Sequence, residues 1–239
     1  MKTRVALALI LFAAAALLCF NPPSASPEGA KESVVIVDAT VQVSPDPFFF
    51  FFSRGRFIEH MSASPARTSA KRISHYRGSG FVVNGHLLTA AHVVLADSGD
   101  KVLSISVTSF HGQSAKVEVV RTDKDADISE LAPVEGAALS LPSLSLADAS
   151  PAVGDKVSEI GHPGMIHFVV SRGEIVGFDQ EQNYNIATLD TFGGDSGGPV
   201  LNSNGRVIGL CHTILRGSRF TGIGTLNALR DFLYPERVR

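Results

Sequence analysis

The strongest chemical signal in this sequence is a serine set among glycines, in the string GGDSGGPV at Gly193–Val200. A serine hydroxyl is a poor nucleophile at neutral pH, so it needs an adjacent base, and the oxyanion formed by its attack on a carbonyl needs hydrogen-bond donors. Glycines on both sides permit a tight turn that brings backbone N–H groups to the reacting atom. We therefore expect Ser196 to be a nucleophile, with the N–H groups of Gly194 and Ser196 forming an oxyanion hole.

The base that such a serine requires is best supplied by His92, in the string LTAAHVV at Leu88–Val94. His92 ends an apolar strand, and the small residues before it leave room for the ring to reach into a cleft. The chain has 8 histidines; six of the others occur in polar loops or turns, and His212 follows the expected strand Arg206–Cys211. We therefore predict that His92 is the general base.

The acid that would orient the imidazole is expected between base and nucleophile in the chain. Asp123, Asp125 and Asp127 all precede the segment Ile128–Leu131. Asp127 directly opens that segment, so strand geometry could fix its carboxylate against the ring. We favour Asp127 and interpret Asp123 and Asp125 as solvated loop charges.

The elements that must position these residues are short strands, because apolar and β-branched residues alternate between clusters of Gly, Asn, Asp and Pro. One helix is expected, from Leu226 to about Leu233, with Pro235 beyond its end. Many evenly spaced strands favour an all-β sandwich or barrels, and a weak boundary falls near residues 137–150. The expected strands are Val34–Val43, Gly80–Val83, Leu87–Thr89, Val102–Thr108, Ala115–Val120, Lys156–Ile160, Phe168–Val176, Asn185–Asp190, Pro199–Leu201, Arg206–Cys211 and Phe220–Thr225.

The N-terminus has the pattern of an export signal. Lys2 and Arg4 precede an uninterrupted apolar run, Val5–Phe20, which is followed by prolines and small residues. We predict a cleaved signal peptide or an uncleaved membrane anchor over residues 1–26 and a linker over 27–33. The protein would then be exported, to the periplasm or the medium or held at the membrane.

Composition supports a folded chain of one or two domains. Of 239 residues, 44% are hydrophobic and 18% charged, and the formal net charge of −2 gives no reason to expect nucleic acid as a partner. The spacing of Cys and His residues does not suggest a zinc site. Loss of residues 1–26 would remove Cys19 and leave only Cys211, so we expect no internal disulfide.

Residues 44–77 interrupt the strand pattern. Five consecutive phenylalanines, Phe48–Phe52, precede a stretch rich in Arg and Lys. Two interpretations stay open: a mobile surface loop, or a segment for self-association or regulation, since a monomer seldom exposes such an apolar cluster.

These motifs resemble the trypsin-like serine peptidases and, among them, the HtrA (Deg) family of exported proteases, over roughly residues 33–232. The resemblance implies two six-stranded antiparallel β-barrels, over about residues 34–140 and 141–226, with the short helix at about 226–234. It implies polypeptide substrates, no metal or organic cofactor, and trimers through the Phe48–Phe52 segment. We expect none of the PDZ domain that usually follows in that family. The matching strings are Gly78–Phe81, Leu88–Val94, Asp127–Leu131, Leu146–Asp148, Val153–Asp155, Gly161–Gly164, Gly193–Val200 and Val207–Leu210, with Asp46–Phe49 similar to the family's Phe-rich loop.

Three positions depart from the HtrA pattern. Asp195 stands where those relatives usually have Asn, and His212 stands where they usually have Thr or Ser, so His212 could contact Asp127 or the substrate backbone. Asp190 lies six residues before Ser196, where trypsin-like enzymes that cut after Arg or Lys place a buried acid. Alternatively, Asp190 ends a strand and points to water, leaving an aliphatic preference.

The sequence as a whole therefore predicts a serine endopeptidase that works through an acyl-enzyme, with His92, Asp127 and Ser196 as its triad. The alternative is a weakly active or inactive peptide-binding or chaperone-like protein on the same fold.

Overall fold

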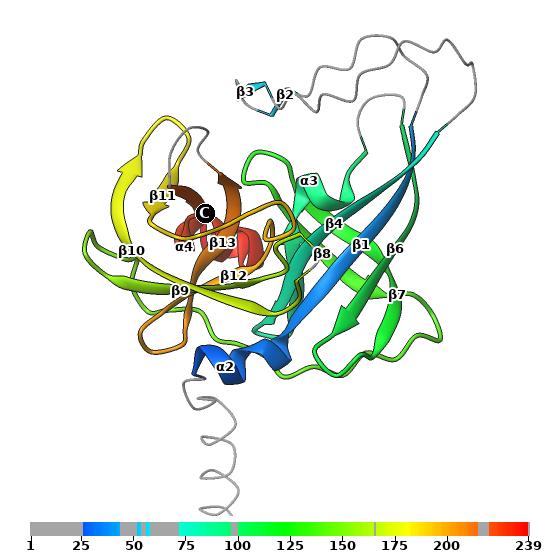
Figure 1. The fold of residues 1–239 in the computed structure, drawn as a ribbon, viewed down its shortest axis with the longest axis horizontal. Coiled ribbons are helices and arrows are strands. Elements are labelled where there is room, and N and C mark those ends of the chain that lie inside the picture. Colours follow the sequence, from blue (N-terminus) through cyan, green and yellow to red (C-terminus); the bar gives the residue numbers. More distant parts are fainter. Residues whose placement is uncertain are drawn as a thin grey trace, which may run out of the picture.

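Two closed barrels, each of six antiparallel strands, lie side by side (Figure 1). The computed structural model describes residues 26–43, 52–53, 56–57, 72–96, 100–164, 166–214 and 220–238. The predicted fold class, all-β with two six-stranded barrels and a short C-terminal helix, is confirmed.

In each barrel, every strand pairs with the next one in the order given below, and the last strand pairs with the first to close the barrel. The first barrel runs β1 (Val34–Val43), β4 (Arg72–Val83), β5 (His86–Ala90), β8 (Ile128–Pro133), β7 (Ser114–Asp123) and β6 (Lys101–Ser109). The second runs β10 (Val169–Asp179), β11 (Tyr184–Ala187), β14 (Thr221–Gly224), β13 (Val207–Ile214), β12 (Pro199–Asn202) and β9 (Lys156–Gly161). The other elements are α2 (Pro27–Ala30), η1 (Lys31–Ser33), β2 (Phe52–Ser53), β3 (Arg56–Phe57), α3 (Ala91–Val94), α4 (Leu226–Leu233) and η2 (Pro235–Val238).

The alternating sequence of β1 shows why these segments form barrel strands. Val35, Val37 and Ala39 are buried on one face of the strand, while the polar residues between and beyond them are partly exposed. Val37 lies opposite Gly78 of β4 on one side and Val107 of β6 on the other. Pairing on both edges leaves β1 without a free edge, as barrel closure requires.

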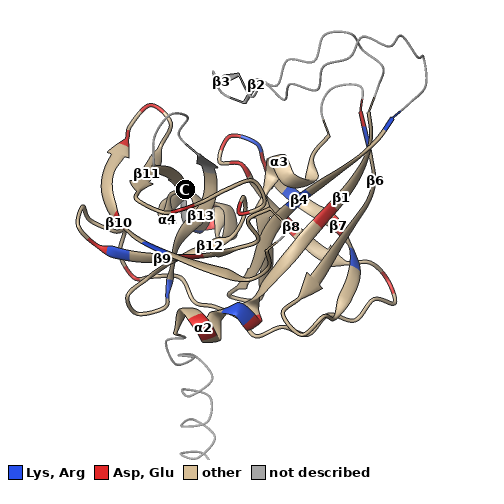
Figure 2. Cartoon of the chain, in the orientation of Figure 1, with Lys and Arg blue, Asp and Glu red and all other residues tan. Residues whose placement is uncertain are grey.

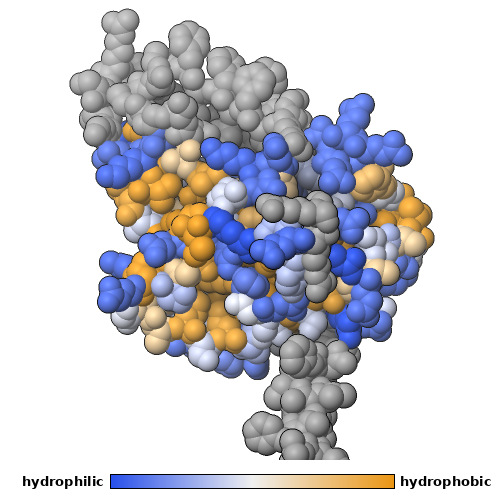
Figure 3. All heavy atoms as spheres, turned by 180° about the vertical axis from the view of Figure 1, so that it is seen from behind, coloured by the Kyte–Doolittle hydropathy of each residue, from blue (hydrophilic) through white to orange (hydrophobic). Residues whose placement is uncertain are grey.

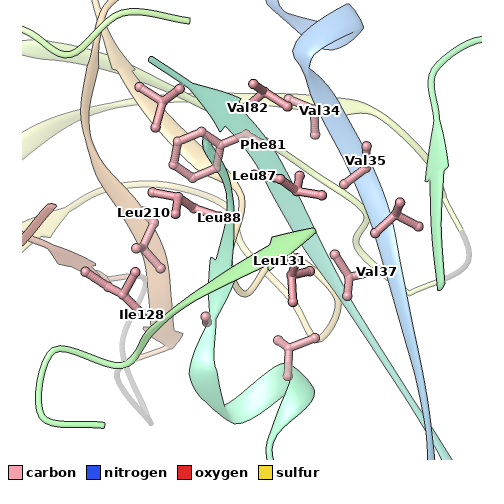
Figure 4. Packing of buried hydrophobic residues seen from close by; sticks show 14 of the residues in the cluster. Val34, Val35, Val37, Phe81, Val82, Leu87, Leu88, Ile128, Leu131 and Leu210 are labelled. Atoms are coloured by element: carbon pink, nitrogen blue, oxygen red, sulfur yellow. The ribbon is translucent and has the colours of Figure 1, made fainter. Parts of the chain in front are cut away.

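One hydrophobic cluster extends from the first barrel into the second, which also has a cluster of its own. Leu210 of β13, in the second barrel, packs among side chains of the first barrel, beside Leu88 of β5 and Ile128 of β8 (Figure 4). All three side chains are fully or almost fully buried. This contact fixes the second barrel against β5 and β8. His92 lies just after the end of β5, and Asp127 lies just before the start of β8.

We predict that Leu210→Ala lowers the free energy of unfolding by about 2–5 kcal/mol, because it removes buried methyl groups and leaves a cavity between the barrels. Leu103→Ala on β6 is the matched control, since Leu103 is 46% exposed and should change stability by about 0.5 kcal/mol or less. Urea denaturation measures both. Equal effects of the two substitutions would contradict a shared core.

The predicted linker at residues 27–33 is wrong, because this segment is helical and packs on the barrels. The Ser26 hydroxyl accepts a hydrogen bond from Gly29 N at 3.2 Å and caps α2, with a proline in the first turn. Ala30 is fully buried, and Arg172 Nη2 of β10 donates to Glu28 Oε1 at 3.1 Å. The Pro/Ser composition that suggested a linker supplied a helix cap instead.

The interruption predicted for residues 44–77 ends earlier than expected. β4 begins at Arg72, which lies opposite Val43 of β1, and Arg77 lies opposite Asp38. Arg77 Nε donates to Asp38 Oδ1 at 2.7 Å. The polar residues in this half of β4 concealed the strand, whose backbone is paired although much of its side-chain surface is exposed.

Two predictions fall outside the described residues. One is the signal peptide or anchor over residues 1–26, of which only Ser26 is described, and the other is the Phe48–Phe52 segment, of which only the Phe52 backbone is described. Among helices of the described ranges, none combines the length and apolar character needed to cross a bilayer.

The C-terminal helix α4 follows the second barrel, packs against β13 of that barrel and also contacts the first. The Thr225 hydroxyl caps it by accepting from Ala228 N at 3.2 Å. Arg121 of β7 donates to the Phe232 carbonyl at 2.6 Å and stacks 4.3 Å above that ring. Arg121 Nε also donates to Glu130 Oε2 of β8 at 2.6 Å. The helix therefore ties the two barrels together.

The surface of the described residues is mixed in charge and hydropathy. Along the backbone of both barrels, Lys and Arg positions are interspersed with Asp and Glu positions (Figure 2). On the opposite face, hydrophobic patches are separated by hydrophilic groups (Figure 3). Exposed apolar side chains include Val120 of β7 and Phe178 of β10.

Candidate active site

His92 and Asp127 meet where two paired strands of the first barrel end. β5 pairs with β8 so that Ala90 lies opposite Ile128, and each functional residue is close to one of these ends. His92 Nδ1 lies 2.6 Å from Asp127 Oδ2, and the His92 backbone N donates to Asp127 Oδ1 at 2.8 Å. Both carboxylate oxygens therefore orient the histidine, and a proton on Nδ1 leaves Nε2 free as a base.

Asp127 has a backbone conformation that L-residues seldom adopt, with φ of 54°. Its carbonyl accepts from Ala91 N at 3.0 Å, which holds the start of α3 in place. Burial raises the pKa of Asp127, but the hydrogen bonds from His92 and the charges of His92 and His212 outweigh burial and hold that pKa below its ordinary value. The carboxylate therefore stays ionised at neutral pH.

The other two candidate acids belong to the turn before Asp127. Asp123 Oδ1 accepts from the backbone N–H groups of Asp125 and Ala126, at 2.8 and 2.9 Å. Such bonds stabilise a turn. Asp125 is exposed. Of the three candidate acids, the structure thus places Asp127 against His92, whereas Asp123 and Asp125 belong to the turn.

A second imidazole lies against the same carboxylate. His212 Nε2 of β13 is 3.1 Å from Asp127 Oδ2 and 3.1 Å from the Tyr184 hydroxyl, and the His212 side chain is only 5% exposed. Burial lowers the pKa of His212 to about 4, although Asp127 acts in the opposite direction. A neutral imidazole here can still donate one hydrogen bond to Asp127, so the second barrel also holds the acid in position.

Ser196 lies across the barrel interface from the His92 turn. Its carbonyl accepts from Ser79 N of β4 at 2.8 Å. A Cβ at Gly78 would lie 2.9 Å from that carbonyl oxygen and 2.6 Å from a methyl group of Val93, the residue after His92. The serine loop and α3 therefore pack on the same β4 residue.

The next glycine allows a still closer approach. Gly197 has φ of +88°, and a Cβ there would lie 2.3 Å from the Ser79 carbonyl oxygen and 2.7 Å from Ala90 N, at the end of the strand that leads to His92. Among the described residues, no hydrogen bond joins the Ser196 hydroxyl to His92. Such catalytic bonds are commonly longer without substrate.

The loop before Ser196 is held by carbonyl contacts that leave its amides available. Gly193 O accepts from Gly164 N, and Gly194 O accepts from the Ser79 hydroxyl, both at 2.8 Å. Gly194 has φ of +109°, and a Cβ would lie 2.2 Å from the His162 carbonyl oxygen. Within the described residues, the amides of Gly194 and Ser196 have no backbone acceptor. They are the two donors expected at an oxyanion hole.

Three buried residues lie behind this loop: His162 and Glu159, which the sequence analysis did not single out, and Asp195, which it noted only as a departure from the HtrA pattern. His162 is fully buried, with Nδ1 2.8 Å from the Ser79 hydroxyl; because that hydroxyl donates to Gly194 O, Nδ1 must carry the proton. Burial lowers the pKa of His162 to about 3, so the ring is neutral. Glu159 and Asp195 are each only 1% exposed. Glu159 could have been found from its place in β9, where it shares the inward face with Val157.

Asp190 does not occupy the buried position considered for a specificity acid. β11 ends at Ala187, and Asp190 follows it as an exposed residue whose backbone N donates to Ser171 Oγ at 3.0 Å. The premise of a costly buried carboxylate is therefore not met in this structure. Within the described ranges, no three His, Cys, Asp or Glu side chains cluster as metal ligands.

Two six-stranded barrels with a glycine-rich serine loop at their interface are typical of one class of peptidase, and sequence comparison identifies the same class. Residues 78–210 match the family model of the trypsin-like peptidase domain. The chain belongs to this family.

Its relatives include DegP-like proteins. The chain is 31% identical over 178 residues to a "Probable periplasmic serine endoprotease DegP-like" of Halomonas elongata, covering 71% of this chain and 36% of that protein. It is also 31% identical over 194 residues to a protein of the same name from Chlamydia trachomatis, covering 75% and 37%. The chain thus spans little more than a third of the length of these relatives.

Solved structures share the fold. The active form of a Mycobacterium tuberculosis protease superposes with a TM-score of 0.62 at 21% identity, over 85% of this chain and 80% of that one. A serine endoprotease from Yersinia pestis superposes with a TM-score of 0.60, also at 21% identity, over 92% and 68%. At this identity the likeness establishes the fold.

Proposed function

We propose that this chain is an exported serine endopeptidase, with Ser196 as nucleophile, His92 as general base and Asp127 as the acid that orients His92. The observation that carries the proposal is the double hydrogen bond from His92 to Asp127, next to the β4 residues on which the Ser196 loop packs. Membership of the trypsin-like peptidase family and DegP-like relatives support it.

The proposed reaction follows from these positions. His92 Nε2 takes the Ser196 hydroxyl proton as Oγ attacks the carbonyl carbon of the peptide, and the resulting oxyanion accepts from the N–H groups of Gly194 and Ser196. Collapse breaks the C–N bond, and His92 passes its proton to the leaving amine. Water then attacks the acyl-enzyme, giving a proton to His92, which returns it to Ser196 as the acid product leaves. Asp127 remains ionised throughout.

Export and assembly rest on different observations. The apolar run Val5–Phe20 and the periplasmic designation of the relatives support export to the periplasm or beyond, with the run cleaved or kept as an anchor. We further propose that the Phe48–Phe52 segment mediates trimer formation, because association of five aromatic side chains between copies of the chain would remove apolar surface from water. Sedimentation with and without residues 46–57 tests this: an unchanged mass would contradict it.

Incubation with unfolded casein separates the endopeptidase from a chaperone-like binder. The proposal expects internal casein fragments, identified by mass spectrometry, whose formation stops after treatment with a serine-directed inhibitor. Binding of casein that leaves it intact would favour the chaperone-like alternative.

We predict that Asp190→Ser changes the preference for Arg or Lys over Val at the cleavage site by less than about fivefold, because an ion pair with an exposed carboxylate contributes only about 0–1 kcal/mol. Cleavage profiling on a mixed peptide library measures the preference. A loss of about a hundredfold for basic substrates alone would instead show that substrate binding buries this carboxylate and that it selects Arg or Lys.

A further inference from the structure

Two buried carboxyl groups lie close together behind the nucleophile. Glu159 of β9 and Asp195, the residue before Ser196, are each 1% exposed. A Cβ on Gly161 would lie 2.4 Å from Glu159 Oε1 and 2.4 Å from Asp195 Oδ1. The two oxygens therefore lie on the same small space beside Gly161, which is too narrow for a methyl group. Among the described residues, neither oxygen accepts a hydrogen bond from a backbone amide, a hydroxyl, a ring nitrogen or a cationic side chain.

The groups around this pair bring no positive charge to it. The free, buried thiol of Cys211 lies beside it on β13, and the pKa of that thiol is raised by burial and by both carboxyls. His162 follows β9 with a neutral ring, and His167 and Arg77 act on that ring, lowering its pKa. Within the described part of the chain, no salt bridge reaches Glu159 or Asp195. Two adjacent carboxylates cannot both be ionised in such a site, so the pair must hold a proton.

Hydrogen bonds determine which carboxyl carries that proton. Asp195 Oδ2 accepts from Phe192 N at 2.8 Å, and the nearby backbone N–H of His162 also lowers the pKa of this carboxyl. These bonds favour the ionised form of Asp195. Glu159 Oε1 receives no such bond, so the proton belongs to Glu159, which can donate it to Asp195 Oδ1.

We propose that Glu159 is a positioning residue of the active site: its protonated carboxyl donates to the Asp195 carboxylate and thereby holds the Phe192–Ser196 loop in its active shape. The proposal deepens the proposed function and rests on it. Asp195 connects the two ends of this loop, because its carboxyl binds Phe192 N while its own backbone leads into Ser196. Without the Glu159 proton, two repelling charges would lie under the Gly194 and Ser196 amides.

This arrangement makes the loop sensitive to alkaline pH. Burial, and then the charge of Asp195, raise the pKa of Glu159 well above its ordinary 4.5, while burial raises the pKa of Asp195 to about 6 despite its backbone bonds. Above about pH 6 the pair thus holds one proton, until the pH passes the raised pKa of Glu159. A carboxyl whose pKa is raised on folding binds a proton more tightly in the folded chain, so its contribution to stability falls as the pH rises from 4.5 toward the folded value.

The test compares the wild-type chain with Glu159→Gln and Glu159→Ala, and with Glu118→Gln on the exposed face of β7 as the control. A glutamine amide donates to Asp195 without needing a proton, whereas alanine leaves Asp195 without a donor. Two quantities are measured from pH 5 to pH 10: kcat and KM for fluorescently labelled casein, and the melting temperature.

We expect the wild type and Glu118→Gln to lose activity together at alkaline pH, mainly in kcat. Glu159→Gln should stay within about threefold of the wild type at pH 7 and lack that alkaline loss. Glu159→Ala should lose at least about tenfold in kcat at pH 7, with little change in KM, as expected when one oxyanion donor is displaced. Glu159→Gln should also melt higher than the wild type at pH 9, with the gap closing toward pH 5.

An alkaline limb that is the same in Glu159→Gln and in the wild type would overturn the proposal, as would full activity of Glu159→Ala. A merely structural Glu159 would make both variants less stable at every pH. If the wild type hydrolyses nothing, the proposed function fails while the melting curves still decide the pair: no pH-dependent gap between Glu159→Gln and the wild type means no shared proton.

Discussion

Replacing Ser196 with alanine is expected to lower the turnover of peptide substrates by about 10⁶-fold, because the acyl-enzyme can no longer form. The fold should be unaffected, since the loop is held by backbone contacts such as that of Ser79 N with Ser196 O, at 2.8 Å. Steady-state kinetics on a peptide substrate and a thermal melt measure the two properties. The control is Ser203→Ala, in the exposed turn between β12 and β13, which should change neither. Activity retained by Ser196→Ala would remove this serine from the mechanism.

Replacing Asp127 with asparagine is expected to lower kcat by about 10⁴-fold, because an amide in place of the carboxylate lets the imidazole adopt the wrong tautomer and leaves the imidazolium without its counter-charge. The bond of 2.6 Å between His92 Nδ1 and Asp127 Oδ2 is the contact at stake.

The same substitution at its neighbours provides matched controls. Asp123→Asn and Asp125→Asn alter carboxylates in the same turn that do not reach His92, so we expect each to retain kcat within about tenfold, allowing for a loosened turn. A larger loss in either control than in Asp127→Asn would mean that the acid is misassigned.

Much of the fold could be predicted from local patterns. β1 spans Val34–Val43 and α4 spans Leu226–Leu233, as the alternation of apolar residues and the helix-terminating proline indicated. Local patterns failed where polar residues form paired strand, as in Arg72–Arg77 of β4, because the neighbouring β1 supplies the hydrogen bonds there. They also failed at α2, because a segment rich in Pro and Ser can form either a linker or a helix with a serine cap.

Some residues of the candidate site could likewise be predicted from local patterns, and others could not. His92 and Asp127 could be chosen because each adjoins a recognisable strand. The contact between Ser79 and His162 joins residues 83 positions apart, and only the closed barrels bring them together. Glu159 carried a signal, an acidic residue on the inward face of a strand, but its partner Asp195 could not be inferred without the fold.

The central claim is that His92 activates Ser196 for attack on a carbonyl. Fluorophosphonate labelling of the purified chain, followed by intact mass and peptide mapping, tests this most directly. We expect one adduct per chain, located on Ser196, and a labelling rate at least about 10³-fold lower in His92→Ala, since the reagent reports nucleophile activation by the base. No adduct, an adduct on another serine, or equal labelling rates with and without His92 would contradict it.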